Sequence, residues 1–161
     1  MVVLLMGVAG CGKTTVGLAL AKALGWGFRD ADDFHPPENV AKMAAGLPLD
    51  DTDRAPWLAA IRTHLDGVRA RGESAVVTCS ALKERYRAVV APDPATVKLV
   101  HLDGDFTLIL ERISARTGHF MKPEMLRSQF AALERPAGAL VLDVAETPAT
   151  LVAQIRTAFH L

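Results

Sequence analysis

One stretch of the chain has the residue types and spacing to hold phosphate, Gly7-Val8-Ala9-Gly10-Cys11-Gly12-Lys13-Thr14. It fits the pattern G-x-x-x-x-G-K-[ST] of a phosphate-binding loop, or P-loop. Its glycines let the backbone curl, so that amide N–H groups and the positive end of the next helix face phosphate oxygens. We expect Lys13 to reach the β- and γ-phosphates and the Thr14 hydroxyl to bind Mg²⁺. The alternative is a chance glycine-rich turn, which the flanking strand and helix disfavour.

Carboxylates follow the second predicted strand, in Asp30-Ala31-Asp32-Asp33-Phe34-His35. Ligands of open α/β sheets lie at strand ends of this kind. Asp30 and Asp32 are one residue apart, so both can point the same way from an extended backbone. We expect one to serve the Mg²⁺ shell and the other a substrate hydroxyl. The alternative is that Asp32 or Asp33 only caps the next helix, and His35 is open to either a ligand or a structural role.

Several cations suggest an anionic substrate. Arg54 lies at the start of a long predicted helix ending at Arg71, where the helix dipole disfavours a positive charge. A substrate carboxylate gripped by the guanidinium would explain it, and pairing with Asp50, Asp51 or Asp53 is the alternative. Lys83 and Arg87 are four residues apart in a helix predicted over 82–90, hence on one face. The alternative for that face is a solvated basic surface.

A further pair of arginines, Arg112 and Arg116, precedes the segment 117–123, which holds Gly118 and ends at Pro123. Arginines beside such a loop are the expected apparatus of a lid that closes over phosphates. An ordinary surface helix with paired arginines is the alternative, and the P-loop favours the lid.

Apolar strands alternate with helices along the whole chain, which predicts a parallel sheet sandwiched by helices. We predict strands over 1–6, 27–30, 74–78, 97–102 and 140–144. Helices are predicted over 15–24, 37–45, 82–90, 105–116 and 125–134, and the last helix is predicted to begin at Thr147-Pro148. A long helix capped by Thr52 or Asp53 is predicted to end at residue 71. The length of 161 residues suits a single domain.

Composition narrows the function classes. Lys plus Arg equals Asp plus Glu, 18 of each, which argues against nucleic acid or an anionic membrane as the main partner. Apolar runs are too short for a membrane span, and a signal peptide is not expected. Two cysteines, Cys11 and Cys79, make no disulfide framework, which indicates the cytoplasm. Both thiols are expected near the nucleotide, where their modification would inactivate the protein.

With these features placed, the chain resembles the gluconate kinases (gluconokinases), small P-loop kinases related to shikimate kinase and adenylate kinase. The resemblance covers nearly the whole chain, and the pattern from His35 to Trp57 is its most specific part. The segments that carry it are MGVAGCGKTT, DADDFHPPENVAKMAAGLPLDDTDRAPWL, CSALKERYR, VHLDGDF, RTGHFMKPEML and QFAALERP.

The resemblance implies a fold and an activity. The fold is a three-layer α/β P-loop kinase fold with a five-stranded parallel sheet in the order 2-3-1-4-5, flanked by helices and bearing a lid. The activity is phosphorylation of D-gluconate at its 6-hydroxyl by ATP with Mg²⁺, and the resemblance also allows a homodimer. The alternatives are a kinase for another sugar acid or shikimate, and a nucleotide-dependent switch without an acceptor.

Residue roles follow from the same resemblance. Asp32 resembles the carboxylate that orients and deprotonates the acceptor hydroxyl, and Asp30 the outer-sphere Mg²⁺ residue. Arg54 resembles the arginine that holds the substrate carboxylate. The loop from Gly7 to Thr15 would hold ATP, and Lys13 and Arg116 would stabilise the transferring group. The remaining assignments are His35, Lys83 and Arg87 to the polyol, Arg116 and His119 to the lid, and Arg112 with Pro148 to the adenine.

The sequence departs from the family pattern at two positions. Ala31 stands where relatives often have Gly, and Cys11 where they often have Ser. Neither departure removes a required functional group.

Overall fold

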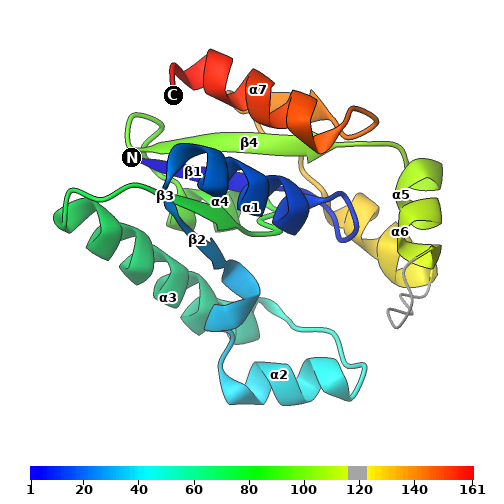
Figure 1. Ribbon diagram of the computed structural model, residues 1–161. Helices are drawn as coiled ribbons and strands as arrows, with labels where there is room; N and C mark the ends of the chain where they lie inside the picture. The colour runs from blue at the N-terminus through cyan, green and yellow to red at the C-terminus, as the bar shows by residue number, and fades with distance from the viewer. Residues whose placement is uncertain (116–122) are drawn as a thin grey trace.

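Five parallel strands form one sheet in the order β2-β3-β1-β4-β5 (Figure 1). The computed structural model describes residues 1–115 and 123–161. The strands are β1 (Val2–Met6), β2 (Gly27–Asp30), β3 (Ala75–Thr78), β4 (Val97–Asp103) and β5 (Leu140–Asp143). The predicted strand order is therefore confirmed. In such a sheet all carboxyl ends lie along one edge, where the chemistry is expected.

Helices cover both faces of the sheet, and β1 shows why. Every residue of β1 is fully buried. Because side chains alternate between faces along a strand, Val3 and Leu5 pack with α1 (Lys13–Leu24) and α7 (Pro148–Phe159). Leu4 and Met6 belong to a second cluster with α3 (Asp51–Ala70) and α4 (Glu84–Val90). A central strand that is apolar on both faces thus produces three layers.

The remaining elements lie toward the carboxyl edge of the sheet or away from the layers. The short 3₁₀-helix η1 (Ala31–Phe34) follows β2 directly, and α2 (Pro37–Ala44) lies apart from the sheet near the start of α3 (Figure 1). After β4 come α5 (Phe106–Ser114) and α6 (Pro123–Ala132). In the described part of the chain, no helix has the length and apolar character to cross a membrane.

Several predicted helix starts differ from the structure: α1 begins at Lys13 instead of Thr15, and α6 begins at Pro123, the last residue of the predicted lid segment, instead of Met125. Two further differences have local causes. Helix α3 is capped by Asp50, not by Thr52 or Asp53. Asp50 accepts from the Asp53 amide at 2.9 Å, and the Asp53 carboxylate accepts from the Asp50 amide at 2.9 Å, a reciprocal capping box. Helix α4 begins at Glu84 rather than at residue 82, with Lys83 as its N-cap. Lys83 therefore belongs to the connection after β3 and not to the helix.

Candidate active site

The loop between β1 and α1 has the backbone that its glycines predict. Gly7, Gly10 and Gly12 have φ of 148°, 79° and 97°, in the region that favours glycine. A Cβ at Gly10 would lie 2.4 Å from Ile113 Cγ1, so this glycine also lets α5 pack against the loop. Gly12 is the N-cap of α1 and has no side chain to occupy the first-turn amides. Those N–H groups are suited to an anion at the helix start.

Lys13 and helix α6 contact the loop itself. Lys13 Nζ donates to the carbonyls of Gly7 at 3.0 Å and Val8 at 2.9 Å. The Ala9 N–H donates to Gln129 Oε1 at 2.7 Å, from α6. Gln129 lies within the segment QFAALERP, but its contact with the loop depends on tertiary packing and has no local sequence signal. The structure thus adds Gln129 to the residues at the phosphate loop.

Asp30 joins the end of β2 to the phosphate loop. Its Oδ2 accepts from Thr14 Oγ1 at 3.1 Å, and its Oδ1 accepts from the Asp32 amide at 3.2 Å. Neither Asp32 nor Asp33 caps a helix here, because Asp30 is the N-cap of η1 and Pro36 is the N-cap of α2, the helix predicted over 37–45. A threonine hydroxyl beside a carboxylate is a hard oxygen donor set, which fits Mg²⁺. The described residues contain no cluster of three or more His, Cys, Asp or Glu side chains that could hold a metal ion.

Asp32 and His35 lie next to each other beyond Asp30. Asp32 Oδ1 is 4.0 Å from His35 Nε2, and the Asp32 side chain is 81% exposed, against 6% for His35. Partial desolvation, and then the Asp30 charge, raise the pKa of Asp32. Burial lowers the pKa of His35, which favours a neutral ring. His35 stacks on Trp57 with ring centroids 4.5 Å apart, and Trp57 Nε1 donates to the Ala31 carbonyl at 2.7 Å.

Arg54 lies in a cationic cluster around Tyr86. Its Nη1 donates to the Tyr86 hydroxyl at 3.3 Å, and that hydroxyl donates to Asp51 Oδ1 at 2.5 Å. Arg85 pairs with Asp51 Oδ2 at 2.6 Å, and Lys83 Nζ is 5.7 Å from the Tyr86 ring centroid. Of the aspartates proposed as alternative partners for Arg54, Asp51 is occupied by Tyr86 and Arg85. Three cations around one ring create a positive region suited to an anion.

Arg87 is placed differently from the prediction. Its residue is only 7% exposed, and its Nη1 donates to the carbonyls of Ala81 at 3.0 Å and Leu82 at 2.9 Å. Ala81 has a φ of 40°, unusual for a residue with a side chain. Lys83 and Arg87 therefore do not form one exposed basic face, because Arg87 turns inward to hold the connection after β3. Lys83 is the half-exposed cation of the two.

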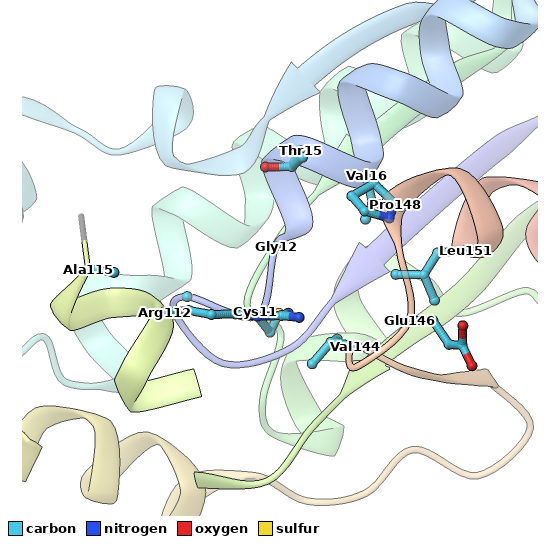
Figure 2. Close-up of a pocket in the computed structure, with 11 residues that line it drawn as sticks. Cys11, Gly12, Thr15, Val16, Arg112, Ala115, Val144, Glu146, Pro148 and Leu151 are labelled. Atoms are coloured by element: carbon cyan, nitrogen blue, oxygen red, sulfur yellow. The ribbon is translucent and has the colours of Figure 1, made fainter. Parts of the chain in front are cut away.

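A cavity of about 320 Å³ opens on the other side of the phosphate loop (Figure 2). Arg112 reaches it from α5 and Pro148 from the first turn of α7, so the two residues assigned to adenine share one cavity. Glu146, just before α7, also lines it and is not among the residues that the sequence predicts for the site. The full lining is Gly10, Cys11, Gly12, Thr15, Val16, Arg112, Ala115, Val144, Glu146, Pro148 and Leu151.

Both thiols lie near the loop but are poorly placed to react. Cys11 and Cys79 are each 1% exposed. Burial raises the pKa of Cys11, and it raises the pKa of Cys79 to about 12. Because the thiolate is the reactive form, we expect slow modification at neutral pH, contrary to the expectation from the sequence. The predicted lid residues Arg116 and His119 lie outside the described residues, as does 117–122 of the segment 117–123.

The P-loop follows β1 of a parallel sheet in this strand order, and the carboxylate of Asp30, at the end of β2, contacts it. This combination defines the class of P-loop kinases. The model of the shikimate kinase family matches residues 9–155. The chain is 48% identical over 131 residues to a gluconokinase of Gluconobacter oxydans (strain 621H), spanning 81% of this chain and 74% of that protein. It is 46% identical over 154 residues to a probable gluconokinase of Rattus norvegicus, spanning 84% and 83%.

A solved structure agrees with these relatives. The gluconokinase from Sinorhizobium meliloti 1021 matches with a TM-score of 0.84 and 40% identity, over 98% of this chain and 94% of that one. The chain therefore belongs to the gluconokinase family, within the shikimate kinase group of P-loop kinases.

Proposed function

We propose that this protein is a gluconokinase, which transfers the γ-phosphoryl group of ATP to the 6-hydroxyl of D-gluconate to give 6-phosphogluconate. The relatives that carry this name support the substrate. The observation that carries the proposal in the site is the position of Asp32. Its backbone N–H donates to Asp30, whose carboxylate accepts from Thr14 of the phosphate loop, and its own carboxylate is 4.0 Å from His35 Nε2.

On the phosphate side, the loop from Gly7 to Thr15 holds the ATP phosphates through backbone N–H groups. Lys13 exchanges the carbonyls of Gly7 and Val8 for phosphate oxygens, because an ammonium group favours an anion over neutral carbonyls. Arg112 and Pro148 flank the adenine. Thr14 would bind Mg²⁺ through its hydroxyl and Asp30 would act from the outer shell of the ion, which would neutralise charge on the phosphates.

On the acceptor side, Asp32 orients the 6-hydroxyl and accepts its proton, while Arg54 holds the gluconate carboxylate. Lys83 and His35 contact the polyol. The resemblance assigns Arg87 to the polyol, but its buried hydrogen bonds to Ala81 and Leu82 support a role in holding the connection between β3 and α4, which carries Lys83. Arg116 and His119 would act on the transferring group and the substrate, and these two roles remain predictions.

The test is Asp32→Asn, which keeps the shape of the side chain but removes its charge. ATP affinity by calorimetry should stay within about tenfold, because the loop and Lys13 hold the phosphates. Gluconate phosphorylation in a coupled assay should fall roughly 10²-fold or more, the scale for losing a general base. Asp33→Asn is the matched control, since Asp33 is exposed and next in sequence, and should stay near wild type. Normal turnover by Asp32→Asn would remove the base assignment.

A substrate panel separates the remaining alternatives. ATP consumption is measured with gluconate, other aldonic acids and shikimate, the last because the matching family model is that of shikimate kinase. ATP turnover without any acceptor would instead favour a nucleotide-dependent switch. We also propose that residues 1–161 act as one kinase domain in the cytoplasm. A homodimer remains a prediction from the family, for sedimentation to test.

A further inference from the structure

Asn39, on α2, is a buried polar residue for which the proposed reaction gives no role. It is 3% exposed. Its Nδ2 is 2.8 Å from the Asp53 carbonyl oxygen and 3.3 Å from His35 Nδ1. A carbonyl oxygen can only accept, so the atom facing Asp53 must be the amide nitrogen. Since that nitrogen only donates, its second hydrogen is the one shared with His35, and His35 Nδ1 must accept.

This contact settles where the proton of the His35 ring lies. A neutral imidazole has one donor and one acceptor nitrogen, so accepting at Nδ1 leaves the hydrogen on Nε2. Nε2 is the nitrogen that faces Asp32 Oδ1. The ring cannot easily turn over, because it is 94% enclosed and lies parallel to Trp57 within 5°. A protonated ring would place an Nδ1–H against the Asn39 amide hydrogens, so Asn39 also disfavours the charged form.

The spacing of these residues is set by the backbone between them. Three residues lie between His35 and Asn39: Pro36, which is the N-cap of α2, Pro37, which is its first residue, and Glu38. The backbone N–H of Asn39 donates to the Pro36 carbonyl at 3.0 Å. Asn39 therefore lies on the first turn of α2, and its side chain is directed back toward His35. Two prolines with fixed φ make this geometry rigid.

We infer that Asn39 is a positioning residue that fixes His35 as an Nε2–H donor, and that this donor and the Asp32 carboxylate together recognise one substrate hydroxyl. An oxygen about 2.8 Å from both atoms, which are 4.0 Å apart, would see them at about 90°, close to the angle between a hydroxyl's donor and acceptor directions. The hydroxyl then accepts from His35 and donates to Asp32. The inference rests on the proposed function, in which Asp32 receives the acceptor proton.

Because His35 donates and Asp32 accepts, the pair determines which lone pair of the hydroxyl oxygen can attack phosphorus. The hydroxyl has its hydrogen committed to Asp32 and one lone pair committed to His35, so its remaining lone pair is the nucleophile. In the transfer, the O–H proton passes to Asp32 as the oxygen bonds the γ-phosphorus and the bond from that phosphorus to ADP breaks. The opposite tautomer would present a lone pair at Nε2, which would compete with Asp32 for the same hydrogen.

The first test reads the tautomer without any turnover. Long-range ¹H–¹⁵N correlation spectra of the whole protein resolve its five imidazole rings, and His35→Phe assigns the His35 signals. We expect a protonated-type shift for Nε2 and an unprotonated-type shift for Nδ1. An Nδ1–H ring in the wild type overturns the inference, while leaving gluconate phosphorylation untouched as a proposal. Conversely, absence of gluconate turnover would refute the proposed function without changing the ring assignment.

The second test uses Asn39→Leu, with Lys42→Met as its matched control. Lys42 also ties α2 to α3, through Asp53 at 2.7 Å and 2.9 Å, but does not contact His35. Asn39→Leu should redistribute the His35 proton between the two nitrogens and lower kcat/KM for gluconate roughly tenfold, with KM for ATP within about twofold. Lys42→Met should retain the Nε2–H ring and near-normal kinetics. If both variants lose activity equally, or Asn39→Leu keeps the single tautomer, Asn39 is merely structural.

A double variant guards against a trivial loss of folding. His35→Phe keeps an aromatic ring on Trp57 but removes both nitrogens. In that background Asn39→Leu should have little further effect on kcat/KM, because the group through which Asn39 acts is gone. Additive losses in the double variant would contradict the inference, and circular dichroism checks that each variant is folded.

Discussion

At the scale of single residues, the site depends on cations whose partners differ from those that the sequence suggests. The sequence allows Arg54 to pair with an aspartate, whereas in the structure its Nη1 donates to the neutral Tyr86 hydroxyl. Tyr86 stands between the guanidinium and the Asp51 carboxylate, so the charge of Arg54 is balanced only in part and can still bind a carboxylate. This follows from the fold of α4 against α3, so no pattern around Arg54 in the sequence could have disclosed it.

We therefore predict a specific effect of Arg54→Lys. A lysine keeps the charge but loses the planar fork that pairs two N–H groups with one carboxylate. KM for gluconate should rise roughly tenfold or more, and KM for ATP should stay within about twofold. Steady-state kinetics with each substrate varied provides the measurement. Arg62→Lys, on the same helix and paired with Asp66 at 2.7 Å, is the control. Equal changes in both KM values would make Arg54 structural.

At the scale of elements, the connection from β3 to α4 shows how a buried arginine fixes the shape of a loop. Arg87 holds the carbonyls of Ala81 and Leu82, and the Leu82 carbonyl also accepts from the Glu134 amide at 2.9 Å. Ala81 at a positive φ stores backbone strain, of the order of 1 kcal/mol, that these bonds offset. The loop that carries Lys83 is thus held in place by buried hydrogen bonds.

Replacing Arg87 should accordingly affect stability before it affects binding. We expect Arg87→Met to lower the free energy of unfolding by about 2 kcal/mol, because buried carbonyls lose a charged donor. Urea unfolding measures this, and Arg85→Met on the exposed face of the same helix should change it by less than about 0.5 kcal/mol. Unchanged stability with a raised KM for gluconate would return Arg87 to the substrate.

The elements also show what sequence reasoning can reach. The strands and their order were predictable, because apolar periodicity and the P-loop are local and the sheet order came with the family resemblance. The meeting of Thr14 with Asp30 was foreseeable from strand ends on one edge of a parallel sheet. The contacts of Gln129 with Ala9, of Arg87 with Ala81 and of Asn39 with His35 were not. Each depends on how two elements pack, which no spacing within one element records.

At the scale of the whole molecule, three histidines link stability to pH. Burial lowers the pKa of His35, His64 and His101. Within the described residues, His64 Nε2 and His101 Nδ1 are buried without a hydrogen-bond partner. The folded protein therefore resists protonation of these rings, whereas the unfolded chain takes up protons near its ordinary pKa of about 6.5.

We predict that stability falls as the pH drops below about 6.5. Above that pH the rings are neutral in both states and contribute no pH dependence. Below it the unfolded state binds more protons than the folded state. The free energy of unfolding therefore decreases as the pH falls, until the pH reaches the lowered pKa values of the folded state. Urea unfolding at several pH values from 7.5 to 5.5 measures the slope, and His101→Leu should flatten it. A flat or opposite slope in the wild type would refute the prediction.

The hydrogen bond between Ala9 and Gln129 has a thermodynamic consequence for ligand binding. A phosphate oxygen that takes the Ala9 N–H exchanges one acceptor for another, so its net gain is only the difference between a charge-assisted and a neutral bond. Gln129 of α6 and the ligand therefore compete for the same donor, the Ala9 N–H. The two equilibria are linked reciprocally. The factor by which docking of α6 on the loop lowers the affinity for the ligand equals the factor by which the ligand lowers the equilibrium constant for that docking.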